Sequence, residues 1–222
     1  MVCPAQTSDV TGVVSVNRAK AGPGRGSDNS NAVVSLRPIH EAQTVRAPAP
    51  GRYEIRQQHK RFDPPVLALP VGSVVAFPNL DPFFHNVFSL YDGKRFDLGL
   101  YEAGATRSVT FDHVGICYVF CNIHPEMAAA VIVLDTPYYA ISDRAGMFRI
   151  PAVPAGQYLL FVWHQRGKPA TPDAFPQPVT IGPGQTDLPP IRLIESGELM
   201  APHTNKYGRS YDPASPPAGP YK

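Results

Sequence analysis

Four residues of types that bind soft metal ions occur in two short segments of this sequence. The segment CNIHPEM places Cys121, His124 and Met127 at the spacing Cys-x2-His-x2-Met, and His85 lies in an earlier segment, FFHNVFSL. A loop can wrap three ligands around one ion, whereas a straight strand would spread them along a line. We therefore expect 121–127 to be a loop between two strands and His85 to lie on another strand.

The ligand types select the metal. Two imidazoles and one thiolate with a weak axial thioether form the trigonal set of copper electron-transfer sites. Structural zinc sites are closed by four Cys, His or carboxylate ligands, and methionine is not among them. The set therefore predicts one mononuclear type 1 copper with the metal ligands His85, Cys121, His124 and Met127. Such a site needs no open position and no general base, so we predict that the protein is not an enzyme.

Other interpretations of these residues remain open at this stage. Each His or Met could be packed in a core without binding metal, and a complete site could have lost its copper in use. A binuclear copper centre has the spacing Cys-x3-Cys-x3-His-x2-Met; Cys117 and Cys121 match its first part, but His124 falls one residue short. We do not assign any of the other histidines as metal ligands. They are His40, His59, His113, His164 and His203.

Cys117 and Cys121 are not expected to form a disulfide. They lie four residues apart in GICYVFC, which has the composition of a strand. A strand rises roughly 3.3 Å per residue, which places their Cα atoms about 13 Å apart, whereas a disulfide requires less than about 7 Å. We interpret Cys117 as a small buried hydrophobic residue.

The elements that must position these residues are strands. The 26 prolines are about twice the usual share of roughly 5%, and no apolar residues recur at helical spacing over a useful length. Short runs rich in Val, Ile, Phe and Tyr are bounded by Gly, Pro, Asp or Asn, as strands are. We expect strands at 11–16, 31–39, 52–57, 66–79, 85–90, 107–112, 115–121 and 128–135, and further short strands in 142–193 joined by Asp-x-x-Gly and Pro-x-Gly turns.

Composition excludes several classes of protein. A net charge of +2 with thinly spread Lys and Arg does not indicate nucleic-acid binding. No stretch approaches 18 consecutive apolar residues, so we expect no transmembrane segment. The start, Met1-Val2-Cys3-Pro4, shows no signal peptide and is compatible with an export signal that has been removed or with a lipid-modified Cys3.

The segment HNVF followed by Cys-x2-His-Pro-x-Met resembles the cupredoxin family, and the short ligand loop is most similar to that of amicyanin. The resemblance covers roughly 52–135 and implies a Greek-key β-sandwich. It implies His85, Cys121 and His124 as equatorial ligands and Met127 as the axial ligand. It also implies that the amide of Asn86 ties the His85 strand to the ligand loop, and that the exposed edge of His124 is the electron port, ringed by Pro125, Phe83 and Phe84.

The flanking sequence resembles a second family. SDRAGMFRIPAVPAGQYLLFVWH is similar to carboxypeptidase-regulatory or transthyretin-like β-sandwiches, and TGVV and NAVVSLRP resemble the opening strands of that fold. We therefore expect an all-β protein of two sandwiches, with a cupredoxin at 52–135 inserted in or packed on a sandwich made of 9–50 and 136–195. The polar, proline-rich residues 196–222 are expected to form an extended C-terminal tail.

Two functions fit this combination, which resembles bacterial plastocyanin-like or methylamine-utilisation proteins. The first is a periplasmic one-electron carrier or relay that cycles Cu(I) and Cu(II). Its partner would be a redox protein such as a c-type cytochrome, or a membrane-bound electron-transfer complex, with any membrane association made through protein partners. The second is a non-catalytic interaction subunit of a larger membrane-associated complex, in which the cupredoxin fold is kept as architecture.

Overall fold

The computed structural model describes residues 6–18, 28–39, 48–90, 94–169, 175–195 and 204–211. Within these ranges every regular element is a β-strand, which confirms the all-β prediction. No helix in this part of the chain has the length and apolar character needed to cross a membrane.

The described residues divide into two compact units. One unit holds 6–18, 28–39 and the described residues of 136–195, and the other holds the described residues of 48–135 together with 204–211. The second unit is therefore built mainly from a stretch of chain that separates the two parts of the first. The expected tail has its described residues, 204–211, in the second unit; 196–203 and 212–222 lie outside the described residues.

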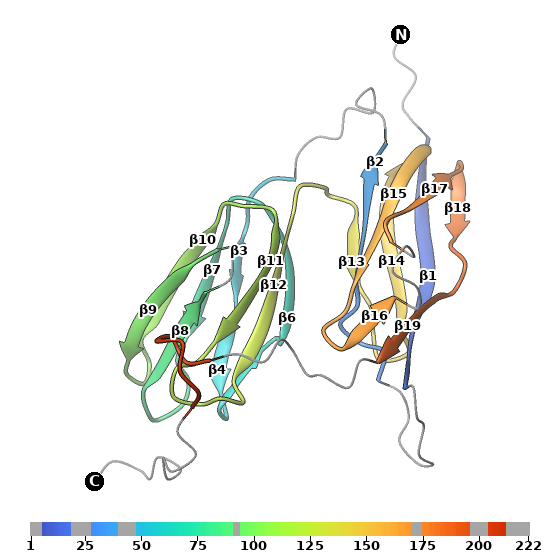
Figure 1. Cartoon of the computed structure of the whole chain (residues 1–222). Coiled ribbons are helices and arrows are strands. Elements are labelled where there is room, and N and C mark those ends of the chain that lie inside the picture. Colours follow the sequence, from blue (N-terminus) through green and yellow to red (C-terminus); the bar gives the residue numbers. More distant parts are fainter. Residues whose placement is uncertain are drawn as a thin grey trace. The chain divides into compact units, whose positions relative to one another are not determined.

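The first unit consists of two sheets around one core (Figure 1). One sheet has the order β14 (Met147–Pro154), β1 (Thr7–Arg18), β19 (Ile191–Glu195) and β16 (Gly167–Pro169), with β18 (Gly184–Asp187) also paired to β1. The other has the order β13 (Tyr139–Ile141), β2 (Val33–Pro38), β15 (Gly156–Trp163) and β17 (Gln177–Ile181). Alternate residues point inward, as strand geometry requires; Phe148 and Ile150 of β14 are buried while their neighbours are exposed.

The Asp-x-x-Gly turn predicted between two of these strands is present. Gly146 N–H donates to the carbonyl oxygen of Asp143 at 2.9 Å, and Met147 N–H donates to the Asp143 carboxylate at 2.9 Å. Gly146 has a φ of 85°, and a Cβ at this position would lie 1.9 Å from the carbonyl oxygen of Val14. Only glycine fits this turn, because both the backbone angle and the space exclude a side chain.

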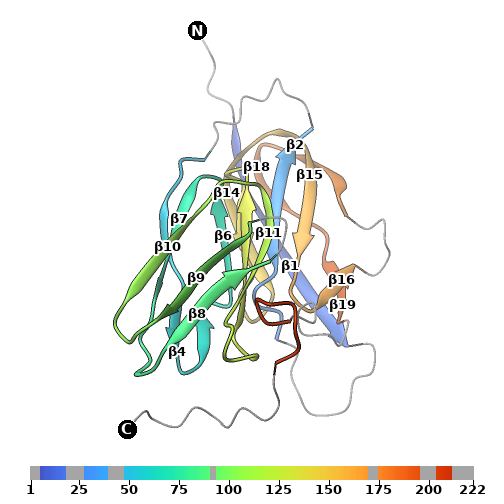
Figure 2. The same cartoon turned by 60° about the vertical axis from the view of Figure 1, so that its left-hand side comes forward.

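The second unit contains the predicted metal ligands and also consists of two main sheets (Figure 2). One has the order β10 (Thr106–Phe111), β7 (Ser73–Pro78) and β3 (Arg52–Glu54). The other has the order β6 (Val66–Pro70), β12 (Ala128–Leu134), β11 (Gly115–Phe120), β8 (His85–Ser89) and β9 (Phe96–Tyr101). A hairpin of β4 (Arg56–Gln58) and β5 (Arg61–Asp63) completes the unit.

Both main sheets of the second unit contribute to one apolar core. Val75 and Phe77 of β7 and Phe111 of β10 meet Val119 of β11 and Val131 of β12 in the same buried cluster. The register of β11 against β12 is regular from Gly115↔Val133 to Phe120↔Ala128. The chain between the paired ends of these two strands, 121–127, is therefore held as a loop on a rigid base.

Candidate metal centre

The ligand loop 121–127 lies where the sequence predicts it, between β11 and β12, and it is closed by its own backbone. Cys121 N–H donates to the carbonyl oxygen of Met127 at 3.2 Å, and Met127 N–H donates to the carbonyl oxygen of His124 at 3.0 Å. These two bonds fold the loop back on itself, so that residues 121, 124 and 127 come from one compact turn.

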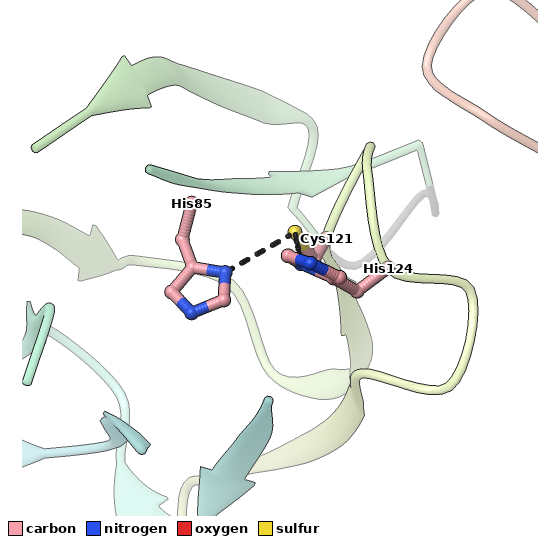
Figure 3. A group of neighbouring side chains, drawn as sticks. All are labelled: His85, Cys121 and His124. Carbon is pink, nitrogen blue, oxygen red and sulfur yellow. Dashed lines mark hydrogen bonds between the residues drawn. The ribbon is translucent and has the colours of Figure 1, made fainter. Parts of the chain in front are cut away.

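His85 begins β8, which pairs with β11 through Phe88↔Phe120, and its side chain meets the loop. The Cys121 Sγ lies 3.8 Å from Nδ1 of His85 and 3.7 Å from Nδ1 of His124. Figure 3 shows the two imidazoles on either side of this sulfur. The three ligand atoms all lie within 4.8 Å of one another. The structure therefore brings three of the four predicted ligands together, from two separate segments of the chain.

These distances fit a single soft metal ion. Nitrogen and sulfur ligands about 2.0 and 2.3 Å from one ion, at a trigonal angle, lie roughly 3.7 Å apart. The sulfur–nitrogen separations of 3.8 and 3.7 Å match that value. Burial lowers the pKa of both imidazoles, and the neutral imidazole is the form that binds metal.

The Cys121 thiol has a mixed environment. Burial raises its pKa, and backbone N–H groups of Asn86, Ile123 and His124, which donate to the sulfur, lower it; the net direction is upward. Without a metal the residue is therefore a protonated thiol near neutral pH. The same three N–H groups are ready to stabilise the negative charge of a thiolate when a cation replaces the proton.

Asp81 fixes the orientation of His85, and the sequence analysis did not identify it. Its Oδ2 accepts a hydrogen bond from Nε2 of His85 at 2.8 Å, and both side chains are buried. This contact keeps the proton on Nε2 and leaves Nδ1 free to face Cys121. The one sequence signal that could have found Asp81 is its position four residues before the ligand, in DPFFH.

The carboxylate of Asp81 is itself held by the β4–β5 turn. His59 N–H donates to Oδ1 at 2.7 Å and Lys60 N–H donates to Oδ2 at 2.9 Å. Both turn residues have positive φ angles, 54° and 55°, which L-residues adopt at a cost. Burial raises the pKa of Asp81, but the hydrogen bonds from Lys60, His85 and His59 outweigh it and lower the pKa overall.

The amide of Asn86 does not do what the resemblance implied. Its Nδ2 donates to Oδ1 of Asp97 on β9 at 2.7 Å, and not to the ligand loop. Asn122, which lies in the ligand loop, accepts a hydrogen bond through its Oδ1 from the backbone N–H of Lys206 at 2.9 Å. The contact between Asn86 and the loop is made by its backbone N–H, which donates to the Cys121 sulfur.

His124 is the most exposed of the three gathered ligands, at 7% against 0% for His85 and Cys121. The ring of Phe83 packs against both imidazoles, with centroid distances of 5.2 Å to His85 and 5.7 Å to His124. Phe84, which precedes His85 in the sequence, and Pro125, which follows His124, are exposed. The electron port stays a prediction.

Met127 closes the loop and is fully buried in the same core cluster as Cys121. Its role as the axial ligand stays a prediction.

Cys117 and Cys121 form no disulfide: both are free and buried, and Cys117 donates a hydrogen bond to Ser89 Oγ at 3.3 Å. His113 is exposed and pairs with Asp112, and His164 is buried against the carbonyl oxygen of Ser30; neither belongs to the site.

No family model matches the sequence, and no curated protein matches it. Solved structures do resemble parts of it. A purple cupredoxin from Nitrosopumilus maritimus is 24% identical, with a TM-score of 0.34, over 37% of this chain and 99% of its own. A copper-containing nitrite reductase from Thermus scotoductus SA-01 is 25% identical, with a TM-score of 0.36, over 44% of this chain and 25% of its own. A mutant of amicyanin with Cu(I) is 21% identical, with a TM-score of 0.35, over 47% of this chain and 99% of its own.

These likenesses concern less than half of this chain, and they include amicyanin, whose ligand loop the sequence resembles. With TM-scores of 0.34 to 0.36 they carry no argument about function.

Proposed function

We propose that this chain is a mononuclear type 1 copper protein that carries or relays one electron at a time. His85, Cys121, His124 and Met127 would hold the copper. Copper bound there supplies the Cu(I)/Cu(II) couple. The observation that carries the proposal is the convergence of one thiol and two imidazole nitrogens at 3.8 and 3.7 Å, each at least 93% buried.

The surrounding residues are suited to a site that changes charge without changing shape. Asp81 holds His85 through its second ring nitrogen, and three backbone N–H groups hold the Cys121 sulfur. The loop backbone bonds of Met127 fix the distance between the two ends of the loop. A preorganised ligand set of this kind does not need to rearrange when the electron arrives or leaves.

The function we propose is electron transfer and not catalysis. Among the described residues a single group of His, Cys, Asp or Glu has the spacing of a metal site. Oxidases and reductases built on copper need a second centre or an open position for substrate.

The partner we propose is a redox protein, such as a c-type cytochrome or a membrane-bound electron-transfer complex, in the periplasm. Exposed apolar side chains support docking beside His124: Phe84 is 45% exposed and Ile123 is 45% exposed, and each adjoins a proposed ligand in sequence. Apolar side chains of this kind form the buried core of a protein–protein contact.

Copper binding and the visible spectrum test this proposal. The purified protein, titrated with Cu(II), is expected to bind about one copper per chain and to show an intense thiolate-to-copper band. Cys121→Ser should abolish the band. Cys117→Ser is the matched control, because this second buried cysteine lies on β11 and is not one of the proposed ligands, and it should keep the band.

A protein that stays colourless and free of copper after the titration would contradict the proposal. It would favour the interaction subunit, in which the fold is kept as architecture.

A further inference from the structure

The segment 204–211 is attached to the second unit beside the metal ligands, although strands of the first unit precede it in the chain. Three hydrogen bonds join it there. Lys206 N–H donates to Asn122 Oδ1 at 2.9 Å, Lys206 Nζ donates to Asp97 Oδ2 at 2.8 Å, and the Tyr211 hydroxyl donates to the carbonyl oxygen of Cys121 at 2.9 Å. In Figures 1 and 2 this segment is the red loop near β8 and β9.

The segment has a defined turn and is not simply an extended tail. Asn205 N–H donates to the carbonyl oxygen of Arg209 at 2.8 Å, and Gly208 N–H donates to the carbonyl oxygen of Asn205 at 2.9 Å. The Asn205 side chain accepts from the N–H groups of Tyr207 and Arg209 at 3.0 and 3.1 Å. Asx side chains stabilise turns in this way, so the turn holds Lys206 in place for its two contacts.

The contacts of the segment reach both sides of the predicted metal site. On the loop side they end on Cys121 and on Asn122, the next residue. On the other side Asp97 accepts from Lys206 and also from Nδ2 of Asn86, the residue after His85. Since the backbone N–H of Asn86 donates to the Cys121 sulfur, the segment links the two parts of the chain that carry the ligands.

We propose that residues 204–211 form a C-terminal clamp that is an integral part of the metal centre. Lys206 and Tyr211 are positioning residues: they hold the ligand loop against the His85 strand and close the Cys121 side of the site to solvent. With that side closed, the edge of His124 is the route by which small molecules and partners reach the ligands.

The charges fit this role. The Lys206–Asp97 pair is partly exposed, at 21% and 41% of the two side chains, and pairs of that kind contribute only about 0–1 kcal/mol to stability. We therefore expect this ion pair to act by fixing the position of the segment and by its local electric field, and to add little to the stability of the fold. Burial raises the pKa of Tyr211, so that its hydroxyl keeps the proton that it donates to the Cys121 carbonyl oxygen.

The clamp itself can be tested without metal. N-ethylmaleimide is applied to the metal-free full chain in a Cys3→Ser background, and modification of Cys121 and Cys117 is followed by peptide mass spectrometry. Ending the chain after Ala201 removes the clamp and should speed modification of Cys121 at least tenfold. Ending it after Tyr211 is the matched control, which keeps residues 204–211 and should leave the rate unchanged.

Cys117 reports on the fold as a whole, because it is fully buried and does not touch the clamp in any contact described above. Its modification should stay slow in every variant. An unchanged Cys121 rate after removal of 202–222 would overturn the clamp. A parallel rise at Cys117 would overturn it too, since the tail would then support the whole unit and not this site.

The positioning role rests on the proposed function and is tested in the copper-loaded protein. Tyr211→Phe keeps the ring and removes the hydrogen bond to the backbone carbonyl oxygen of Cys121. The reduction potential should fall, because the positive end of the hydroxyl dipole next to Cys121 stabilises the electron-rich reduced form. The substitution should also shift the thiolate-to-copper band. Tyr207→Phe, on an exposed tyrosine of the same segment, should change neither.

The two proposals can fail separately. Slow, clamp-dependent modification of Cys121 in a protein that never binds copper would keep the clamp and remove the electron-transfer function. A blue copper protein in which Tyr211→Phe shifts neither potential nor band would keep the function and remove the positioning role of Tyr211.

Discussion

The carboxylate of Asp81 lies between a strained turn and the proposed ligand His85: its Oδ2 is 2.8 Å from Nε2 of His85 and 2.9 Å from the backbone nitrogen of Lys60. Asp81 is 5% exposed and His85 is fully buried. A buried carboxylate next to an imidazole makes the imidazole a better donor to a cation. The β4–β5 turn, through Asp81, is thus expected to influence the proposed metal centre although it supplies none of the ligands.

Asp81→Asn should raise the reduction potential of the copper-loaded protein. The variant removes a negative charge that favours Cu(II) over Cu(I), while its side-chain oxygen can still accept from His85. The expected shift is on the order of 59 mV, the value that changes a one-electron equilibrium tenfold. Protein-film voltammetry measures it. Asp112→Asn is the control. Asp112 lies between β10 and β11, at the end of β11 that is remote from Cys121, so this substitution should leave the potential unchanged.

His59→Gly should stabilise the protein by about 0.5–1 kcal/mol. Glycine adopts the φ of 54° without the steric cost that an L-residue bears, and it keeps the N–H that Asp81 accepts. Urea unfolding of the metal-free protein measures the change. His59→Pro should instead cost about 3 kcal/mol or more, because proline removes that N–H and fixes φ near −65°. Equal stabilities of the three proteins would show that the turn is not strained.

The ligand loop could be predicted from sequence because it is local. Cys121, His124 and Met127 lie within seven consecutive residues between two strongly apolar runs, and their types alone indicate a soft metal. His85 could be added because it opens an alternating strand. Most of the predicted strands are present in the structure. The predicted strand 52–57 corresponds to two strands, β3 and β4, and the predicted strand 66–79 corresponds to β6 and β7.

What surrounds the ligands could not be predicted, because it depends on contacts between distant residues. His59 and Lys60 form a two-residue hairpin turn with positive φ, for which Asn-Gly is the usual sequence signal. The clamp has no periodic pattern, and its polar residues are typical of an unstructured tail. The amide of Asn86 has Asp97 as its partner, a choice that only the placement of β9 decides. The transthyretin-like resemblance of 9–50 and 136–195 stays a prediction.

The metal-free protein should lose stability between about pH 9 and pH 11 partly through Cys117. Burial raises the pKa of this thiol from 9.0 to about 11, so the folded state keeps its proton while the unfolded state loses it. The contribution is fully present below pH 9 and is lost as the pH rises through 11. Two pKa units correspond to about 2–3 kcal/mol.

Cys117→Ala isolates this effect in urea unfolding at a series of pH values. The variant should be less stable at pH 8, because a buried side chain is truncated, and its unfolding free energy should fall less steeply from pH 9 to 11. Other groups titrate equally in both proteins, so only the difference in slope matters. Parallel slopes would show that Cys117 does not titrate differently in the folded state.

Met127→Leu should raise the reduction potential and keep the blue band. A thioether is a weak axial ligand, so His85, Cys121 and His124 should hold copper without it. Leucine removes a soft donor that stabilises Cu(II) more than an apolar side chain does, and the expected rise is on the order of one 59 mV unit, or roughly 1.4 kcal/mol. The exchange costs little in packing, since Leu and Met have similar volumes.

Met147→Leu is the control, because it removes a thioether from a methionine of β14 that is 60% exposed and is not a proposed ligand. Voltammetry decides between the two roles of Met127: a potential equal to that of the unmodified protein would mean that this residue packs in the core and does not ligate the metal.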